Sequence, residues 1–425
     1  MDVLRIATAG SVDDGKSTLI GRLLHDTKSL TKDKLDAITV TSKRKGLDFT
    51  DLSLLTDGLI AEREQGITID VANIYFSTPA RKYIIADTPG HVEYTRNMIT
   101  GASNAQVSII LIDARNGIIE QTKRHLFISS LLKIETVFVC VNKMDLVNFD
   151  EAIFTSIKNQ FIELSKKIGF EGDLQFVPIA ARDGDNVVDN STRMQWYKGP
   201  SLLQLLEELP VHAKERSLPA RLPVQYVIRP RNNDHHDFRG YAGRLKTGTL
   251  QRGKKVVVLP SLKESLIKSV SVADKQVDTA FAGESVVIEL EEDVDVSRGN
   301  MIVDAAPKYN QVNTITATLS WMEEHPLSSG KSFLLQHNTN RVKAKLVELQ
   351  SVLDIKSMEE KTGVAELKLN DIGRVVIKTA KPIFADTYQS NPDNGSFILI
   401  DEFSNNTVAV GFIESFLKCS EQKEK

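Results

Sequence analysis

A stretch near the N-terminus has the residue types and spacing of a phosphate-binding loop. The sequence GSVDDGKS, residues 10–17, matches the pattern G-x-x-x-x-G-K-S between an apolar strand and a helix. Glycines let backbone N–H groups approach an anion closely, and the following helix N-terminus adds a favourable dipole. In such a loop Lys16 reaches the β- and γ-phosphates as a catalytic residue, and Ser17 binds Mg²⁺. The nucleotide-binding residues expected here are Gly10, Ser11, Val12, Asp13, Asp14, Gly15, Lys16, Ser17 and Thr18.

A second motif, DTPGH, ends the strand pattern KYIIA and comprises Asp87, Thr88, Pro89, Gly90 and His91, all expected to contact the nucleotide. An acidic residue at that strand end is placed to hold the Mg²⁺ shell. Gly90 permits a peptide N–H to face the γ-phosphate, and His91 is then positioned to orient the attacking water. A single histidine is usually structural, but its fixed step after Asp-x-Pro-Gly favours the catalytic role.

A third motif, GITID, occupies residues 66–70 in the loop between the first helix and the second strand. We expect Thr68 to supply a hydroxyl to Mg²⁺ in the triphosphate state, in a loop that the γ-phosphate orders and hydrolysis releases. Thr68 therefore joins Lys16 and His91 as a predicted catalytic residue. With Ser17 and Asp87 it completes the predicted magnesium ligands.

The fourth motif, NKMD, ends the strand TVFVCV and consists of Asn142, Lys143, Met144 and Asp145. A carboxylate at Asp145 can accept two hydrogen bonds from the N1–H and the exocyclic amine of guanine. Adenine offers neither donor there, so the carboxylate would be left unpaired. Lys143 can lay its apolar stem on the purine face, and Asn142 can brace the loop. The motif therefore predicts GTP rather than ATP as the nucleotide.

The small-residue loop that usually completes a guanine pocket is expected after the strand LQFVPI. The chain has Ala180, Ala181 and Arg182 there, where many GTPases have Ser-Ala followed by Lys or Leu. The missing hydroxyl alters only the detail of the contact, because the backbone N–H of Ala181 can still serve.

The elements that position these motifs alternate between strands and helices over the first half of the chain. Such alternation predicts an α/β fold with parallel strands, and ligands bind at the carboxyl ends of those strands, where every motif falls. After a polar linker between Pro210 and Pro219, short strands separated by Gly, Pro and polar turns predict all-β barrels. We expect domains at residues 1–212, 219–306 and 311–418, and a disordered tail at 419–425.

Composition narrows the functional classes. The chain has 425 residues, a formal net charge of -3 and 26% charged residues, which argues against a nucleic-acid scaffold. Its two cysteines, Cys140 and Cys419, form no disulfide framework, and Cys140 lies in an apolar run that predicts a core thiol. With no signal peptide and no apolar run long enough for a membrane span, we expect a cytoplasmic protein.

The set of motifs resembles the translation-factor class of GTPases, and several stretches are similar to the GTPase subunit of bacterial sulfate adenylyltransferase. Those stretches are GSVDDGKSTLIGRLLHD, DGLIAEREQGITIDVANIYFST, DTPGHVEYTRNMITGAS, WYKGPSLL and DFRGYAG. The resemblance implies an α/β P-loop GTPase domain with a mostly parallel sheet, followed by two all-β barrel domains. It implies GTP and Mg²⁺ as cofactors and a smaller catalytic subunit as partner, with no nucleic acid or membrane.

In that family the smaller subunit makes adenosine 5′-phosphosulfate and pyrophosphate from ATP and sulfate, and the GTPase subunit couples GTP hydrolysis to that reaction. A rival hypothesis is a translation factor that delivers aminoacyl-tRNA, which shares the GTPase domain and the barrels. It would require a surface for nucleic acid, which the slightly acidic total charge does not favour.

Two other stretches carry no predicted chemistry. SSGKS at residues 328–332 ends like a phosphate loop, but His325 stands where the first glycine is required, so Lys331 and Ser332 are expected in a turn and a strand. The stretch NNDHH, residues 232–236, is expected to be a solvated loop, because two adjacent histidines cannot easily share one metal. We find no second phosphate loop and expect no adenylylsulfate kinase activity.

Overall fold

The computed structural model describes residues 2–44, 50–55, 71–89, 95–210, 213–230, 238–305, 309–354 and 357–418. The chain divides into two compact units. The first comprises Met1–Val211 with Ile355–Met358, and the second comprises His212–Asp354 and Glu359–Lys425.

The first unit is built on a six-stranded sheet in the order β2-β3-β1-β4-β5-β6. The strands are β1 (Val3–Ala9), β2 (Ala72–Ser77), β3 (Lys82–Asp87), β4 (Val107–Asp113), β5 (Thr136–Asn142) and β6 (Asp173–Pro178). All neighbours pair in parallel except β2, which runs antiparallel to β3 at one edge. Because β4 and β5 are almost entirely buried, their sequences are continuous apolar runs rather than alternating ones.

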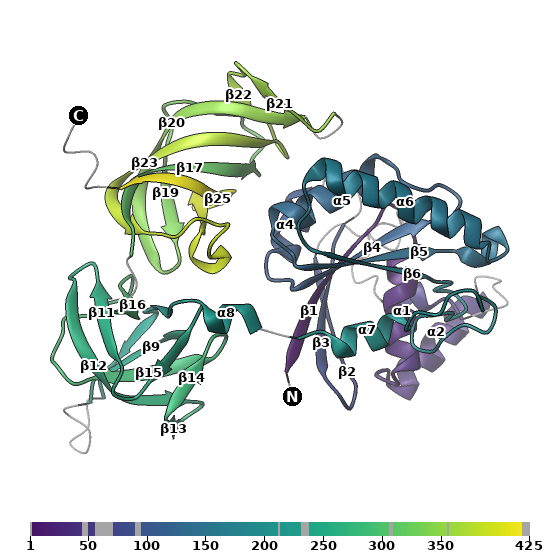
Figure 1. The fold of residues 1–425 in the computed structure, drawn as a ribbon, viewed down its shortest axis with the longest axis horizontal. Helices are drawn as coiled ribbons and strands as arrows, with labels where there is room; N and C mark the ends of the chain where they lie inside the picture. Colours follow the sequence, from purple (N-terminus) through teal and green to yellow (C-terminus); the bar gives the residue numbers. More distant parts are fainter. Residues whose placement is uncertain are drawn as a thin grey trace. The chain divides into compact units, whose positions relative to one another are not determined.

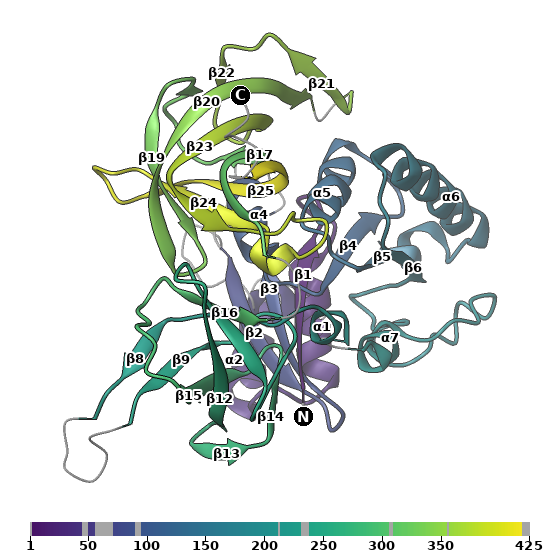
Figure 2. The same ribbon diagram turned by 60° about the vertical axis from the view of Figure 1, so that its left-hand side comes forward.

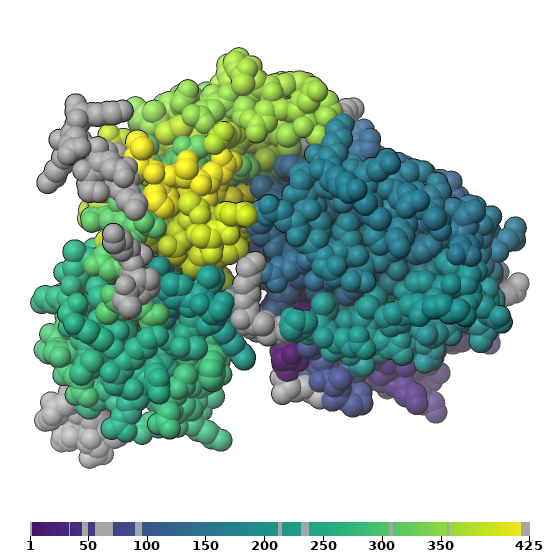
Figure 3. Space-filling view, in the orientation of Figure 1, coloured from purple at the N-terminus to yellow at the C-terminus, as the bar shows by residue number. Residues whose placement is uncertain are grey.

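Helices cover both faces of this sheet, with α4, α5 and α6 on one face and α1, α2 and α7 on the other (Figure 1). Their bounds are α1 (Lys16–Asp26), α2 (Lys32–Arg44), α4 (Thr95–Ala102), α5 (Glu120–Leu131), α6 (Glu151–Ile168) and α7 (Leu202–Glu208). The described part of this unit also contains two short 3₁₀ helices, η1 (Leu52–Leu55) and η3 (Met144–Val147). In the space-filling view the segments between β4 and α7 form one continuous blue and teal surface of this unit (Figure 3).

The core of the first unit lies between the sheet and its helices. It includes Ile6, Leu19, Ile109 and Phe138, each at most 1% exposed. Burying side chains of this size stabilises a fold by about 1.5–3 kcal/mol each. Cys140 is fully buried in the same core, which confirms the predicted core thiol, and burial raises the pKa of its thiol. Cys419 lies outside the described residues.

The second unit begins with a short helix, α8 (Ala213–Ser217), and an antiparallel sheet in the order β7-β16-β11-β12-β15-β9-β8, with β13 added to β12. A bridge between Arg221 and Thr247 joins β7 to the segment after β9. The strands are β7 (Arg221–Pro223), β8 (Tyr226–Ile228), β9 (Gly240–Arg244), β11 (Lys255–Leu259), β12 (Lys263–Val272), β13 (Lys275–Val277), β15 (Ser285–Leu290) and β16 (Met301–Asp304). A separate pair joins β10 (Thr249–Gln251) to β14 (Thr279–Phe281).

The second sheet of this unit closes on itself. Its strands follow the order β19-β24-β25-β17-β23-β20-β21, and β19 also pairs with β20, so the six strands from β19 to β20 form a ring (Figure 2). They are β17 (Gln311–Trp321), β19 (Ser332–His337), β20 (Asn340–Asp354), β21 (Glu359–Thr362), β23 (Ile372–Phe384), β24 (Ser396–Ile400) and β25 (Thr407–Lys418). A small ladder joins β18 (Leu327–Ser328) to β22 (Glu366–Leu367), and the 3₁₀ helix η5 (Pro392–Asn394) precedes β24.

The predicted fold class is confirmed: a mostly parallel α/β domain precedes two antiparallel β structures. Ser332 begins β19 and Lys331 directly precedes it, after a turn in which Gly330 has φ 90°, as expected for the false phosphate loop. The stretch NNDHH lies outside the described residues. Among the described helices, none is long and apolar enough to cross a membrane.

Candidate nucleotide-binding site

The phosphate loop turns between β1 and α1, and its backbone geometry requires glycine at one position. Asp13 and Gly15 have φ of 66° and 95°, and Gly15 is the residue that precedes α1. A Cβ on Gly15 would meet Nδ2 of Asn142 at 2.4 Å. The loop therefore passes directly beneath the Asn142 side chain, and only glycine fits there.

Lys16 begins α1 and points back into this loop. Its Nζ donates to the carbonyls of Gly10 at 2.8 Å and Ser11 at 3.1 Å, and the residue is 8% exposed. Burial lowers the pKa of Lys16, while the carboxylates of Asp87 and Asp14 oppose that shift. The cation is thus held in the loop by neutral carbonyls, which an anionic phosphate can replace as its partner.

Asp14 stabilises the loop from within. Its carboxylate accepts the Ser11 N–H at 2.6 Å, and burial raises the pKa of this side chain. Its carbonyl accepts a hydrogen bond at 2.8 Å from Nδ2 of Asn142. Ser17 and Thr18 follow in the first turn of α1, half-buried, and Val12 and Asp13 are exposed at the loop tip.

Asp87 lies at the carboxyl end of β3, beside the phosphate loop. It is in register with Thr8 of β1, whose hydroxyl donates to Asp87 Oδ1 at 3.0 Å. Thr88 anchors the following turn through a 2.5 Å hydrogen bond from its hydroxyl to the Thr8 carbonyl, and Pro89 is buried after it. Three predicted site residues lie outside the described residues, namely Thr68, Gly90 and His91.

Asn142 at the end of β5 connects two of the predicted motifs. Besides its bond to Asp14, its Oδ1 accepts the N–H of Ala181 at 3.0 Å. One amide side chain therefore links the phosphate loop to the loop after β6, as the predicted bracing role requires. That bond also engages the Ala181 N–H that the sequence suggested as a guanine donor. Ala180 is fully buried next to it.

A cluster of three charged residues at the end of β4 was missed by sequence reasoning. Asp113 is 2% exposed and directly opposite Asn142 in the β4–β5 register. Its carboxylate accepts from Lys143 Nζ at 3.0 Å and from the Arg115 guanidinium at 2.6 Å. Burial alone would raise the pKa of Asp113, but bonds from Arg115 and Lys143 outweigh it and lower the pKa to about 2. The signal for it was a carboxylate ending an apolar strand.

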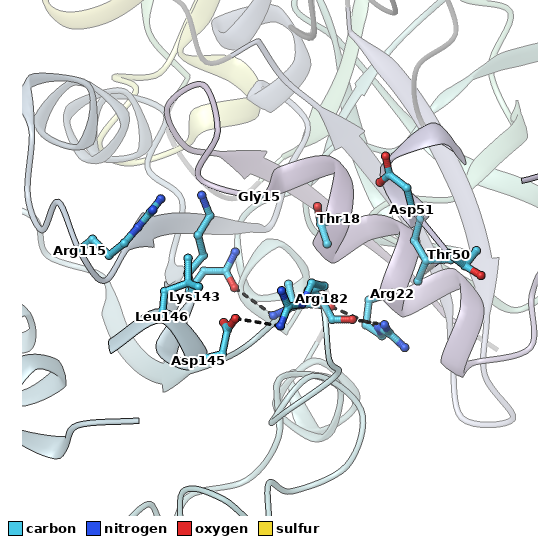
Figure 4. Close-up of a pocket in the computed structure, with 13 residues that line it drawn as sticks. Gly15, Thr18, Arg22, Thr50, Asp51, Arg115, Lys143, Asp145, Leu146 and Arg182 are labelled. Atoms are coloured by element: carbon cyan, nitrogen blue, oxygen red, sulfur yellow. Dashed lines mark hydrogen bonds and ion pairs between the residues drawn. The ribbon is translucent and has the colours of Figure 1, made fainter. Parts of the chain in front are cut away.

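A pocket of about 480 Å³ opens where these loops meet (Figure 4). Asp145, 12% exposed, faces it and forms an ion pair with Arg182 at 3.3 Å, while Met144 is buried beneath. Arg22 of α1 donates to the carbonyls of Ala181, at 3.2 Å, and of Arg182. The pocket is lined by Gly15, Thr18, Arg22, Thr50, Asp51, Leu52, Arg115, Asn142, Lys143, Asp145, Leu146, Ala181 and Arg182.

The residues near Lys16 fit a magnesium ion by the chemistry of their donors. Ser17 offers a hydroxyl at the start of α1, and Asp87 offers a buried carboxylate close enough to Lys16 to influence its charge. Hydroxyl and carboxylate oxygens are the hard ligands that Mg²⁺ takes in nucleotide sites, where water and phosphates complete the shell. Within the described ranges there is no group of three or more His, Cys, Asp or Glu residues that would hold a metal without a nucleotide.

A phosphate loop and an NKMD base loop around one pocket, with a strand-end carboxylate near the lysine of the phosphate loop, define a P-loop GTPase. Residues 1–215 match the family described as the elongation factor Tu GTP binding domain, and residues 314–414 match the GTP-eEF1A C-terminal domain-like family. Within these GTPases, the chain belongs to the sulfate adenylyltransferase subunit 1 family.

Membership rests on similarity over nearly the whole chain. Sulfate adenylyltransferase subunit 1 of Bacteroides fragilis is 50% identical over 416 residues, which cover 97% of this chain and 86% of that protein. The subunit of the same name from Erwinia tasmaniensis is 48% identical, with 97% and 86% covered. The bifunctional enzyme CysN/CysC of Mycobacterium tuberculosis is 46% identical over 97% of this chain and 67% of its own length. Among solved structures, Sup35 complexed with GDP matches with a TM-score of 0.46 and 21% identity, covering 98% of this chain and 95% of that one.

Proposed function

We propose that this chain hydrolyses GTP as subunit 1 of a sulfate adenylyltransferase, coupling hydrolysis to the formation of adenosine 5′-phosphosulfate and pyrophosphate by a smaller catalytic subunit. One observation carries the GTPase assignment. The Asn142 side chain bonds both the phosphate loop and the base loop, at Asp14 O and Ala181 N. The predicted phosphate and base motifs therefore belong to one pocket.

Guanine is selected by the carboxylate of Asp145. It faces the pocket within reach of a purine, and it can accept both the N1–H and the 2-amino group of guanine. Adenine lacks both donors, and leaving a largely buried carboxylate unpaired would cost binding energy. The Lys143 side chain, held by Asp113 at 3.0 Å, lines the same pocket and offers its apolar stem to the base.

The phosphates bind in the loop between β1 and α1. Residues 10–18 surround them, and Lys16 exchanges its carbonyl partners for β- and γ-phosphate oxygens. Ser17, Asp87 and Thr68 would hold Mg²⁺, which neutralises charge on the β- and γ-phosphates when it is bound. Thr88, Pro89 and Gly90 would contact the nucleotide, and Gly90 would let a peptide N–H face the γ-phosphate. Of these residues, Thr68 and Gly90 lie outside the described ranges.

Hydrolysis is an in-line attack of water on the γ-phosphorus, which breaks the bond to the β–γ bridging oxygen and releases GDP and phosphate. His91 orients the water, and Lys16 stabilises the charge that develops on the phosphoryl oxygens. A His91→Ala variant should keep GTP affinity and lose most phosphate release. Full hydrolysis in that variant would remove His91 from the mechanism.

The partner is the smaller subunit that holds the ATP and sulfate site, and the complex is expected in the cytoplasm. The decisive experiment measures sulfate-dependent pyrophosphate release by the two purified subunits, with GTP, with GDP and without guanine nucleotide. We expect release to rise with GTP and not with GDP. Release that is independent of GTP would contradict the coupling, whereas phosphate release by the chain alone tests the GTPase assignment separately.

A further inference from the structure

The base-recognition carboxylate already has a cationic partner in the pocket. Arg182 directs one guanidinium nitrogen to Asp145 Oδ2 at 3.3 Å, and both residues line the pocket (Figure 4). Asp145 is 12% exposed and Arg182 is 51% exposed. The more exposed cation therefore lies against the carboxylate that a purine in this pocket would have to reach.

Arg182 and guanine offer the same chemistry to Asp145. A guanidinium presents N–H donors in a planar fork, as guanine does with its N1–H and 2-amino group. A guanine that bonds both carboxylate oxygens would need the position at Oδ2 that the Arg182 guanidinium takes. Resting on the proposed function, we propose that Arg182 is an affinity-determining residue that occupies Asp145 in the empty pocket and must leave before guanine binds, so that it weakens guanine-nucleotide binding and speeds release.

The structure provides Arg182 with a second partner to receive it. Its Nε donates to Asp183 Oδ1 at 2.9 Å, and Asp183 also pairs with Arg193 at 2.9 Å through its other oxygen. When guanine takes Asp145, the guanidinium keeps the bond to Asp183 and stays in solvent. The displacement therefore exchanges one ion pair for hydration, without leaving a buried charge unpaired.

Hydrogen bonds from two other elements anchor the backbone next to Arg182. Arg22 of α1 donates to the carbonyls of Ala181 and Arg182, and Asn142 holds the Ala181 N–H. The base loop is thus anchored on both sides of residue 181. A rotation of the Arg182 side chain can open or cover the carboxylate without disturbing the loop.

The test compares guanine-nucleotide affinity and release in wild-type protein and in Arg182→Ala and Arg182→Gln variants. An exposed ion pair is worth up to about 1 kcal/mol, so both variants should bind a fluorescent GDP analogue about two- to fivefold more tightly and release it correspondingly more slowly. Arg193→Ala is the matched control, because it removes the same charge next to Asp183 but does not line the pocket. It should leave both quantities unchanged.

Measuring Arg182→Ala in a second variant distinguishes loss of the Arg182–Asp145 pair from the general effect of removing a positive charge. In Asp145→Asn the amide can pair with the 2-carbonyl of xanthine, so affinity is measured with xanthosine diphosphate. Arg182→Ala should have no effect on affinity in this background, because the carboxylate it competes for is gone. An equal gain in both backgrounds would overturn the proposal.

The results also distinguish a failure of the role proposed for Arg182 from a failure of the proposed function. Weaker GDP binding in Arg182→Ala would show that the arginine favours nucleotide binding, and unchanged binding would show that it has no effect. Either result would overturn the role proposed for Arg182 but not the proposed function. A wild-type chain that binds no guanine nucleotide would contradict the proposed function itself.

Discussion

At the scale of single residues, Gly15 shows how closely the phosphate and base loops approach each other. Gly15→Ala would place a Cβ 2.4 Å from the Asn142 amide and would strain a φ of 95°. A left-handed conformation alone costs a non-glycine residue about 1–2 kcal/mol. We expect GDP affinity to fall more than about tenfold, measured by fluorescence titration, because the loop must shift away from Asn142.

Gly169→Ala is the matched control for that substitution. Gly169 ends α6 with φ 73°, and a Cβ there meets nothing within 4 Å. Gly169→Ala should lower the stability of the fold by a similar amount, because the backbone is strained in the same way, while leaving GDP affinity unchanged. Equal affinity losses in the two variants would mean that the contact with Asn142 does not matter.

The lowered pKa of Asp113 predicts that the stability of the fold depends on pH. Its pKa is lowered from 3.8 to about 2, so its ionised form stabilises the fold above pH about 4, and this contribution is lost as pH falls through about 2. Asp113→Asn should therefore cost about 1–2 kcal/mol at pH 7, and the difference from wild type should shrink between pH 4 and pH 2. Urea unfolding at several pH values measures this, and a difference that stays constant down to pH 2 contradicts it.

The sequence predicted individual site residues where a motif fixes a local geometry. The motifs position Lys16, Asn142 and Asp145 through local sequence alone, because each lies at or after the carboxyl end of a parallel strand, at the same edge of the sheet. Asp113 and Arg22 were not predicted, because their partners depend on the register of β4 with β5 and on the approach of α1 to the loop after β6. Such contacts have no local pattern.

At the scale of helices and strands, elements with a clear local sequence pattern were again predicted, and elements without one were not. The strands β1, β3, β5 and β6 were predicted because buried parallel strands are continuous apolar runs. The helix α2 was not, because its residues are mostly polar and exposed, and neither was β12, whose buried and exposed residues alternate weakly.

The last helix of the first unit has a cap that predicts a stability effect. Arg81, 7% exposed, donates to the carbonyls of Leu206 at 2.8 Å and Leu209 at 2.6 Å, at the carboxyl end of α7, and pairs with Asp2. Arg81→Ala should destabilise this unit by about 2–3 kcal/mol, because it leaves helix carbonyls buried without donors. Faster amide exchange in α7 would report the loss.

Asp2→Asn is the control for the cap. It removes only the ion pair with a carboxylate that is 45% exposed, and should cost less than about 1 kcal/mol. Equal effects of Arg81→Ala and Asp2→Asn would mean that the carbonyl contacts contribute nothing.

At the scale of the whole molecule, the two β structures of the second unit are joined by a buried ion pair. Arg221 of β7, with its side chain 5% exposed, donates to Asp386 at 3.3 Å, and Asp386 also accepts from Asn391 and Asn394. Arg221→Ala would leave that carboxylate without its counter-charge, and should cost about 3–5 kcal/mol.

The chain's two tryptophans allow the measurement. Trp196 lies in the first unit and Trp321 in the second, so fluorescence in a Trp196→Phe background reports unfolding of the second unit alone. Lys246→Ala is the control, since its pair with Asp393 is about one third exposed on both sides and should contribute less than about 1 kcal/mol. A loss from Lys246→Ala as large as that from Arg221→Ala would contradict the role of burial.

The ring formed by β17, β19, β20, β23, β24 and β25 determines how the molecule bears a mechanical load. β25 is bonded to β17 from Ala409 to its end at Lys418, and to β24 over Thr407–Phe412. A pull applied after Lys418 loads the ladder with β17 first, and the ladder with β24 resists at the other half of the strand. Anything tethered there, such as a fused domain or a surface linker, would strain the whole barrel before it could peel its last strand away.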